Sequence, residues 1–169
     1  MPNFLSLTEL KGRLHITFAD DDAELQGYID AAESYLADPQ NGILRRPVLA
    51  TEFVERFDRF SDVALAFPDD VTAVSVAYID ADGAEQDLAE IYTVEDGYLV
   101  LNRGETWPQA RSVTVTYTAG WAPNAVPAAI KEAGYFIARS YYEQGHEIDQ
   151  ERFRAVVAFM VAGYRRVGL

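Results

Sequence analysis

Residues 113–137 read VTVTYTAGWAPNAVPAAIKEAGYFI, and within them the hydrophobic period changes from two to about 3.6. Up to Thr118, valine and tyrosine alternate with threonine, which predicts a strand with one buried face. Gly120 ends this strand. Pro127 suits the first turn of a helix, where its missing N–H removes no hydrogen bond, and apolar residues then recur at helical spacing. The stretch therefore predicts a strand that is followed directly by a helix.

The segment before this junction keeps the strand pattern back to Thr51. Asp80–Gly83 and Glu95–Gly97 interrupt it with residues typical of tight turns, in which glycine adopts positive φ at little cost. Two hairpins are therefore expected within a β region over about residues 51–118.

Helical patterns lie on both sides of the β region, over about residues 7–37 and 127–167. Ser6 and Glu9 have the spacing of a capping box, in which the serine side chain accepts from an N–H and the glutamate reaches back. Asp21 and Glu24 have the same spacing. Helices and strands are thus segregated, which predicts an α+β fold, a helical bundle of about four helices with a central antiparallel β-rich insertion. We expect one domain over residues 1–169.

The composition is that of a globular protein, with 49% hydrophobic and 24% charged residues. The absence of cysteine excludes disulfides, thiolate metal sites and a cysteine nucleophile. The apolar runs are much shorter than a bilayer crossing needs, and no basic and apolar secretory leader is present. The cytoplasm is the expected compartment.

The net charge of −13 is concentrated in residues 51–100, which hold 13 acidic and 2 basic side chains. A surface of this sign repels nucleic-acid phosphates, so a DNA-binding domain is not predicted. Two interpretations stay open. In the first, the carboxylates only keep the protein soluble. In the second, they face a partner or a channel.

No constellation for catalysis or metal binding is present. The two histidines, His15 and His146, lack a nucleophile or a second metal ligand beside them, and no phosphate-binding loop occurs. The densest carboxylate cluster comprises Asp80, Asp82, Glu85 and Asp87. Turn chemistry explains this cluster better than a calcium loop does, so we expect no cofactor and no enzymatic activity.

Two further groups of residues are candidate binding elements. The aromatic residues Trp107, Tyr117 and Trp121 would suit a small β-rich ligand- or protein-binding module, although packing is the other interpretation. The last helix carries an apolar stripe of Phe153, Val156, Val157, Met160, Val161 and Tyr164, with Arg152, Arg154, Arg165 and Arg166 beside it. Such a helix either packs on its own subunit or docks on a partner.

Several segments occur in an order that resembles the head–tail connector family of tailed phages, also called adaptor or head-completion proteins. The segments lie between residues 5 and 131, a span that includes most of the chain, and they are residues 5–11, 20–25, 74–88, 92–94, 97–101, 107–108, 113–121 and 126–131. The joint order carries the resemblance, because each segment alone is commonplace. Residues 39–46 depart from the Thr-Gly-Arg type of turn that is frequent after the second helix in this family.

The resemblance implies a structural virion protein that forms a closed ring, dodecameric in the particle, below the portal. The implied partners are other copies of the chain, the portal protein, a downstream head-closure or tail-completion protein, and DNA that passes through without specific binding. No membrane is involved. The implied location is the virion neck of a phage, prophage or gene transfer agent, after assembly in the host cytoplasm.

Two sets of site residues follow from this role as hypotheses. The candidates for ring contacts or for lining the channel are Asp80, Asp82, Glu85 and Asp87. The candidate helix for docking on the portal or on a neighbouring subunit carries Arg152, Phe153, Val156, Val157, Met160, Tyr164, Arg165 and Arg166.

Overall fold

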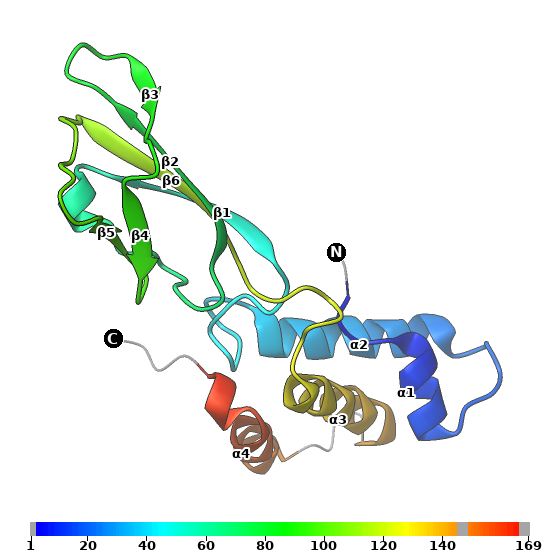
Figure 1. The fold of residues 1–169 in the computed structure, drawn as a ribbon. Coiled ribbons are helices and arrows are strands. Elements are labelled where there is room, and N and C mark those ends of the chain that lie inside the picture. The colour runs from blue at the N-terminus through cyan, green and yellow to red at the C-terminus, as the bar shows by residue number, and fades with distance from the viewer. Residues whose placement is uncertain (1–2, 145–148, 166–169) are drawn as a thin grey trace. The chain divides into compact units, whose positions relative to one another are not determined.

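The chain forms two compact units in the computed structural model, which describes residues 3–144 and 149–165. The helical unit combines Met1–Leu49 with Trp121–Leu169, and the β unit is Ala50–Gly120 (Figure 1). The predicted α+β class, with four helices and an inserted antiparallel sheet, is confirmed within the described residues.

The helical unit contains α1 (Leu7–Leu14), α2 (Asp22–Ala37), α3 (Ala128–Gln144), α4 (Gln150–Met160) and the short 3-10 helix η2 (Ala162–Tyr164). Ser6 caps α1, since its hydroxyl accepts from the Glu9 N–H at 3.4 Å. The predicted return bond from Glu9 is wrong, because that carboxylate accepts instead from the Tyr135 hydroxyl on α3 at 2.9 Å. The Asp21 side chain makes no cap bond at the start of α2. Long-range contacts thus replace part of the local capping.

Apolar side chains at helical spacing form the core of this unit. Leu25, Ile29 and Leu36 of α2 are fully buried, as are Ile130 and Ile137 of α3. Burying each such side chain stabilises the fold by about 1.5–3 kcal/mol. The core therefore depends on the packing of α2 against α3.

The N-terminal segment binds α2 and packs against α3. The N–H groups of Phe4 and Leu5 donate to the same Glu33 carboxylate oxygen on α2, each at 2.8 Å, and both side chains are buried. Gly134 on α3 permits this approach, because an added Cβ would lie 2.7 Å from a methyl carbon of Leu5. Glu33 thus serves as the acceptor for two backbone donors near the core.

We expect Glu33→Gln to remove part of the pH dependence of folding. Burial raises the pKa of the Glu33 carboxyl, although the bonds from Leu5 and Phe4 act in the opposite direction. A carboxyl whose pKa is raised on folding stabilises the protein below its usual pKa and loses that contribution as pH rises through the folded value. The free energy of unfolding of the wild type, minus that of Glu33→Gln, should therefore decrease as the pH rises above about 4.

Urea unfolding of both proteins between about pH 4 and pH 7 measures this difference. Glu24→Gln, which neutralises an exposed carboxyl on the same helix that does not act on the pKa of Glu33, is the matched control. A wild-type-to-variant difference that stays constant with pH would contradict the assignment.

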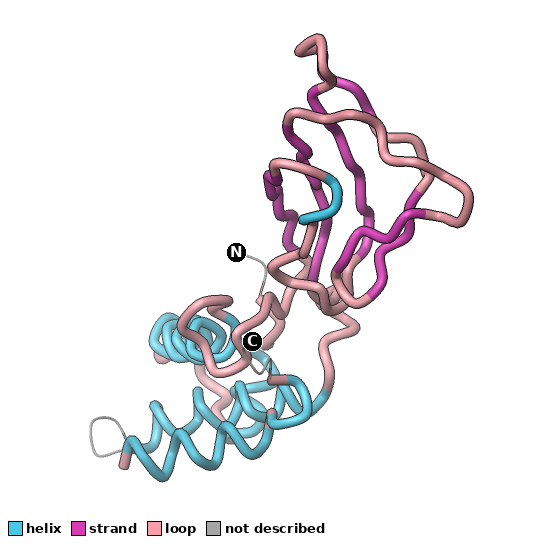
Figure 2. The backbone as a smooth tube through the Cα atoms, turned by 90° about the vertical axis from the view of Figure 1, so that its left-hand side faces the viewer, coloured by secondary structure: helices cyan, strands magenta, loops and turns pink. Residues whose placement is uncertain are grey.

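The β unit contains two antiparallel sheets (Figure 2). The larger has the order β1 (Thr51–Phe57), β6 (Ser112–Ala119), β2 (Thr72–Ile79) and β3 (Glu85–Asp87). The smaller pairs β4 (Tyr92–Glu95) with β5 (Tyr98–Leu101), and a 3-10 turn η1 spans Phe60–Asp62. Leu99 of β5 shares one hydrophobic core with Val76 of β2 and Val115 of β6, so the hairpin packs on the larger sheet.

The central strand β6 has the alternation that its sequence predicts. Val113, Val115, Tyr117 and Ala119 are all fully buried, whereas the intervening positions are half-buried. In the register with β1, Phe53 lies opposite Tyr117. The core of the β unit is therefore built on one face of β6.

Both predicted hairpin turns are confirmed. Gly83 has a φ of 90° in the turn between β2 and β3, and Gly97 has a φ of 82° between β4 and β5. Asp96 precedes Gly97 with a φ of 50°, so both central residues of that turn are left-handed, as a type I′ turn requires. An added Cβ at Gly97 would also lie 2.3 Å from the Cβ of Pro68.

Candidate functional site

The acidic hairpin is defined as Asp80, Asp82, Glu85 and Asp87, and it spans the turn between β2 and β3. Its carboxylates have two different roles. Asp80 is half-buried, and one of its oxygens accepts from the N–H groups of Ala84 at 2.9 Å and Asp82 at 3.0 Å. The bond from Ala84 is the main cause that lowers the pKa of Asp80. Asp80 thus holds the turn, as the sequence predicted.

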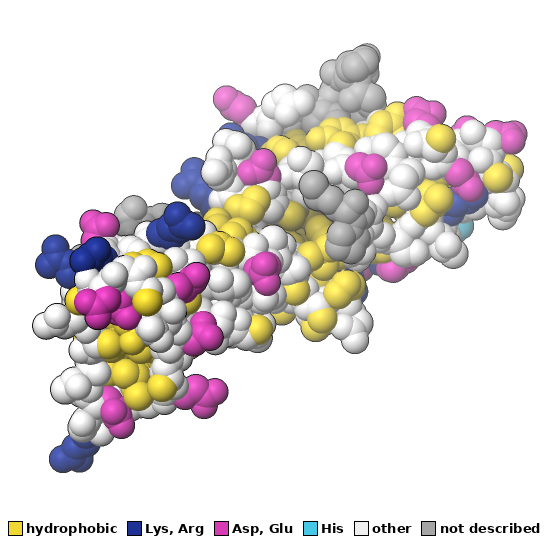
Figure 3. All heavy atoms as spheres, turned by 90° about the horizontal axis from the view of Figure 1, so that it is seen from above, with side chains coloured by type: hydrophobic (Ala, Val, Ile, Leu, Met, Phe, Trp, Pro, Cys, Tyr) yellow, Lys and Arg dark blue, Asp and Glu magenta, His cyan; other side chains and the backbone are white. Residues whose placement is uncertain are grey.

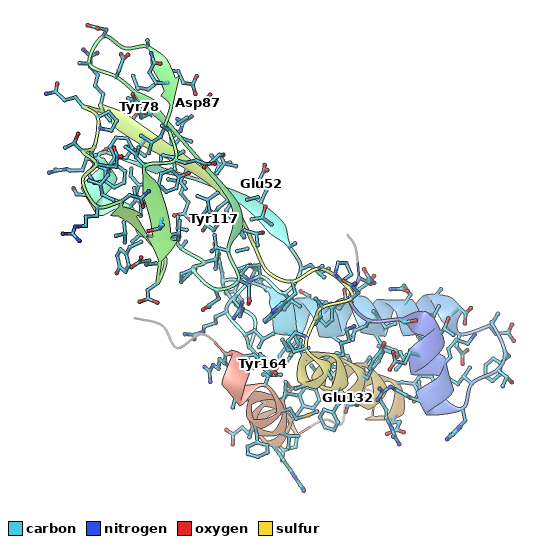
Figure 4. The ribbon with its side chains drawn as sticks, viewed as in Figure 1. Glu52, Tyr78, Asp87, Tyr117, Glu132 and Tyr164 are labelled. Atoms are coloured by element: carbon cyan, nitrogen blue, oxygen red, sulfur yellow. The ribbon has the colours of Figure 1, made fainter. Side chains whose placement is uncertain are left out.

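The other three carboxylates of the acidic hairpin face solvent. Asp82, Glu85 and Asp87 are exposed, and Asp87 lies at the end of β3 that is further from the turn, where it pairs with Ala77 of β2 (Figure 4). No group of three or more candidate metal ligands occurs in the part of the chain that the structure describes. These three side chains therefore present negative charge to solvent.

The negative charge belongs mainly to the β unit. Residues 50–120 hold 14 acidic and 4 basic side chains, a net of −10, whereas the helical unit holds 13 acidic and 10 basic ones, a net of −3. Acidic side chains are distributed over the face of the molecule that Figure 3 shows. The two units therefore differ in the partners that their charge favours.

Helix α4 packs on the helical unit through one side. Phe153 is 8% exposed, and its ring lies 6.0 Å from Tyr35, 5.8 Å from Phe136 and 6.2 Å from Tyr141. Val157 is fully buried on the same side. Of the two interpretations of this helix, packing on its own subunit is what the structure shows for this side.

The predicted apolar stripe is divided between two sides of α4. Phe153 and Val157 are buried and Met160 is half-buried, but Val156 is 39% exposed. Val156 lies three residues from Phe153, about 60° further round the helix, and so falls outside the packed side. The stripe predicted from the sequence therefore included one residue, Val156, that does not belong to the packed side.

The arginines near α4 lie at its surface. Arg152, Arg154 and Arg165 are exposed. Arg166 lies outside the described residues. Tyr164 is half-buried, and its ring lies 6.2 Å from Trp121 in an edge-on arrangement. The exposed side of α4 therefore combines positive charge with apolar surface.

The aromatic residues of the alternative ligand module have internal roles. Tyr117 is fully buried, and its hydroxyl donates to Glu55 and accepts from the Phe67 N–H at 3.2 Å. Trp107 stacks on Phe60 with ring centroids 4.9 Å apart. Both belong to the β unit. The Tyr117 ring is buried and the half-buried Trp107 ring packs on Phe60, so this arrangement favours packing over the binding module.

Trp121 is part of the helical unit instead. Its ring contacts the Arg46 guanidinium, whose carbon lies 4.3 Å from the ring centroid. The backbone N–H of Trp121 donates to the Val48 carbonyl oxygen at 2.8 Å. Cation–π contacts of this kind stabilise a fold by about 0.5–2 kcal/mol. Trp121, the first residue of the helical unit after the β unit, therefore anchors the chain to Arg46 and Val48.

Two exposed aromatic residues were missed in the sequence. Phe159 is 84% exposed on α4, and Phe18 is 51% exposed in the loop between α1 and α2. For Phe159 the available signal was helical spacing, which places this residue about 120° round the helix from Phe153. The neighbours of Phe18, Thr17 and Ala19, gave no such signal. Phe159 and the exposed Val156, three residues apart on α4, form a small apolar patch, and we take this patch and Phe18 as candidate contact surfaces.

The structure describes one of the two histidines. His15 ends α1 in the left-handed conformation and is exposed, and His146 lies outside the described residues. Within residues 3–144 and 149–165, no helix has both the length and the apolar character that crossing a bilayer requires. The exposed charged and apolar surfaces are thus the candidate functional sites.

The chain is similar to known proteins in sequence and in fold. Residues 3–153 match a family model described as "Head completion protein". No match is found among curated proteins.

Three solved structures share the fold. One is described as "Neck of empty GTA particle computed with C6 symmetry", with a TM-score of 0.68 and 19% identity over 96% of this chain and 90% of that chain. A second is "Virion of native gene transfer agent (GTA) particle", with a TM-score of 0.64 and 20% identity over the same shares. The third, "Neck of native GTA particle computed with C12 symmetry", has a TM-score of 0.62 and 19% identity over 96% of this chain and 89% of that chain.

Proposed function

The chain belongs to the head completion protein family, and on this basis we propose that it is a structural, non-enzymatic connector at the head–tail junction of a phage-like particle. The family match over residues 3–153 is the observation that carries the proposal. The match includes both units and all four helices up to Phe153.

The proposed location is the neck of a virion, formed after assembly in the host cytoplasm. Two of the solved structures with this fold are described as necks of gene transfer agent particles, and both cover nearly the whole chain. Their shared fold supports the same location here.

We propose further that copies of the chain form a closed ring, of twelve in the particle, below the portal. The two neck structures are described with C6 and with C12 symmetry, which supports a ring, and the C12 description supports this number. A ring of identical subunits is closed by one repeated contact between two different faces of the subunit. The portal on one side and a head-closure or tail-completion protein on the other are the proposed neighbours.

The acidic β unit suits a channel through which DNA passes. Its net charge of −10 repels phosphates, so DNA would cross without sticking to the wall. The exposed Asp82, Glu85 and Asp87 are the proposed channel-facing residues of the acidic hairpin. A basic surface on a neighbouring subunit is the other proposed contact for them.

The exposed side of α4 is the proposed docking element. Arg152 and Val156 are exposed there, and Arg165 is exposed after η2, whereas Phe153 and Val157 hold the helix on its own subunit. A helix that is fixed on one side and exposes apolar and charged groups on the other presents a preformed surface to a partner.

Deletion of the gene tests the proposed role. Without the connector, cells should accumulate heads that lack tails, and supplying the chain in trans should restore complete particles. Electron microscopy of lysates counts the two kinds of particle. Complete particles in the deletion strain would overturn the proposal.

Charge reversal tests the acidic hairpin. We expect the triple substitution Asp82→Lys, Glu85→Lys and Asp87→Lys to lower the titre of DNA-carrying particles about tenfold or more, because lysines on every copy would bind the passing phosphates. Asp80 is left unchanged, since its bonds hold the turn.

The matched control neutralises the same three positions with Asn, Gln and Asn. This control should have a smaller effect than the reversal if charge is the cause. Circular dichroism of each purified variant checks that it folds. A wild-type titre for the lysine variant would contradict the channel assignment.

A further inference from the structure

Two exposed aromatic side chains lie at opposite ends of α2 within the helical unit. Phe18 comes just before the N-terminal end of α2, in the loop that follows α1 (Figure 1). Helix α4 lies near the C-terminal end, where Phe153 contacts Tyr35. The 16 residues of α2 span about 24 Å, so Phe18 and the exposed Phe159 of α4 belong to separate faces of one unit.

The loop face, defined as Phe18, Asp20 and Asp21, is apolar and acidic. Its conformation is braced, because the Lys11 ammonium donates to the Phe18 carbonyl oxygen at 2.6 Å and also pairs with Asp22. Residues 14–44 contain seven acidic residues and neither lysine nor arginine. Phe18 is therefore held at the surface within a negatively charged region.

The helix face, defined as Arg152, Val156 and Phe159, is apolar and basic. Spacings of four and three residues place these side chains on one side of α4, opposite the buried Val157. Val156 is 39% and Phe159 84% exposed. The ion pairs found among the described residues do not include Arg152.

The two faces complement each other in charge and in apolar character. We infer that the loop face of one copy of this chain docks on the helix face of the next copy. Phe18 packs against Val156 and Phe159, and Asp20 and Asp21 approach Arg152. Because the faces differ and lie at opposite ends of α2, the contact is head-to-tail and repeats from copy to copy. The inference rests on the proposed ring and names the surfaces that close it.

Both halves of this pair are present on one chain, so a second copy fits the helix face better than an unrelated protein does. An acidic surface meeting a basic one also favours the correct orientation of neighbours over the reverse. An aromatic residue that inserts between apolar neighbours is the kind of anchor that dominates many interfaces.

Cysteine cross-linking tests the contact directly, since the chain has no cysteine of its own. Particles are prepared from cells that make only the double variant Phe18→Cys/Phe159→Cys, and a short thiol-reactive cross-linker is added. We expect a ladder of covalent oligomers at multiples of the chain mass. Each single variant should give no ladder. Particles that contain the double variant but give no ladder would overturn the inference.

A charge exchange keeps the inference testable if the cysteine variant does not assemble. Arg152→Glu, or Asp20→Arg with Asp21→Arg, should each lower incorporation of the chain into particles about tenfold, and the combined variant should restore it to within about threefold. Arg154→Glu, an exposed change on another side of α4, is the matched control and should have little effect.

The outcomes separate the contact from the proposed function. If Arg152→Glu impairs assembly and the loop exchange does not rescue it, α4 binds a different protein and the contact is wrong. If particles require the chain but show neither ladder nor rescue, the connector role stands without this contact. If complete particles form without the chain, the proposed function fails and the inference falls with it.

Discussion

Tyr117→Ala is expected to lower the free energy of unfolding of the β unit by about 3–5 kcal/mol, the usual cost of removing a large buried ring. Tyr117 is fully buried at the centre of β6, and its ring centroid lies 5.6 Å from that of Phe53. The strand itself cannot shift to fill the space, because it is hydrogen-bonded to β1 on one side and to β2 on the other. The substitution therefore leaves a cavity in the core.

Tyr117→Phe separates the hydroxyl from the ring. It removes the donor to Glu55 and the acceptor for the Phe67 N–H, and it should cost about 1–3 kcal/mol. Tyr98→Ala on β5 is the control, since Tyr98 is 53% exposed and its loss should cost less than about 1 kcal/mol.

Urea unfolding followed by the fluorescence of Trp107 measures these differences, with Trp121→Phe as the background so that the signal comes from the β unit. Trp107 stacks on Phe60 within that unit and so reports its unfolding. If Tyr117→Ala lowers the free energy of unfolding no more than Tyr98→Ala does, the assignment of Tyr117 to the core is wrong.

Gly42→Ala is the second substitution with a large expected effect, a loss of about 3 kcal/mol in the free energy of unfolding. An added Cβ would lie 2.6 Å from the Asp38 carbonyl oxygen and 2.8 Å from both the Asp38 nitrogen and the Leu36 carbonyl oxygen. These are backbone atoms. They cannot move without disturbing the end of α2, where the Gly42 N–H donates to the Asp38 carbonyl oxygen at 2.9 Å.

Gly27→Ala is the matched control for this prediction. Gly27 lies inside α2, and nothing stands within 4 Å of an added Cβ. Alanine should therefore stabilise the helix there by about 0.5–1 kcal/mol. Urea unfolding followed by circular dichroism compares the two variants, and equal shifts would contradict the close approach at Gly42.

Much of the fold follows from local chemistry and could be predicted. The ends of α1 and the end of α2 at Ala37 agree with the spacing of apolar residues and the stop at Asp38–Gly42. The turns at Gly83 and Gly97 agree because a left-handed residue in a tight turn favours glycine whatever surrounds it. The alternation in β6 predicted its buried face, since side chains alternate along any strand.

The errors concern groups whose partners lie far away in the sequence. Glu9 has the spacing of a capping box but binds Tyr135, because a protonated hydroxyl from α3 reaches it. Burial raises the pKa of Tyr135 to about 12, which keeps this hydroxyl a donor. Val156 was grouped with Phe153 because helical spacing does not say which residues a neighbouring helix covers.

The candidate functional site was likewise predicted only in part. The acidic character of residues 51–100 is a property of the sequence, and so is the clustering of Asp80, Asp82, Glu85 and Asp87. The structure separates Asp80, which holds a turn, from three carboxylates that face solvent.

By itself, the sequence determined the α+β class, the order of helices and strands, the two glycine turns and the concentration of charge between helices, because periodicity, turn conformation and charge are local properties. Only the tertiary structure decided that Trp107 stacks on Phe60, that α4 is packed through Phe153 and Val157, and that Phe18 and Phe159 are exposed. Burial depends on which distant segments cover a side chain, and no short stretch of sequence contains that information.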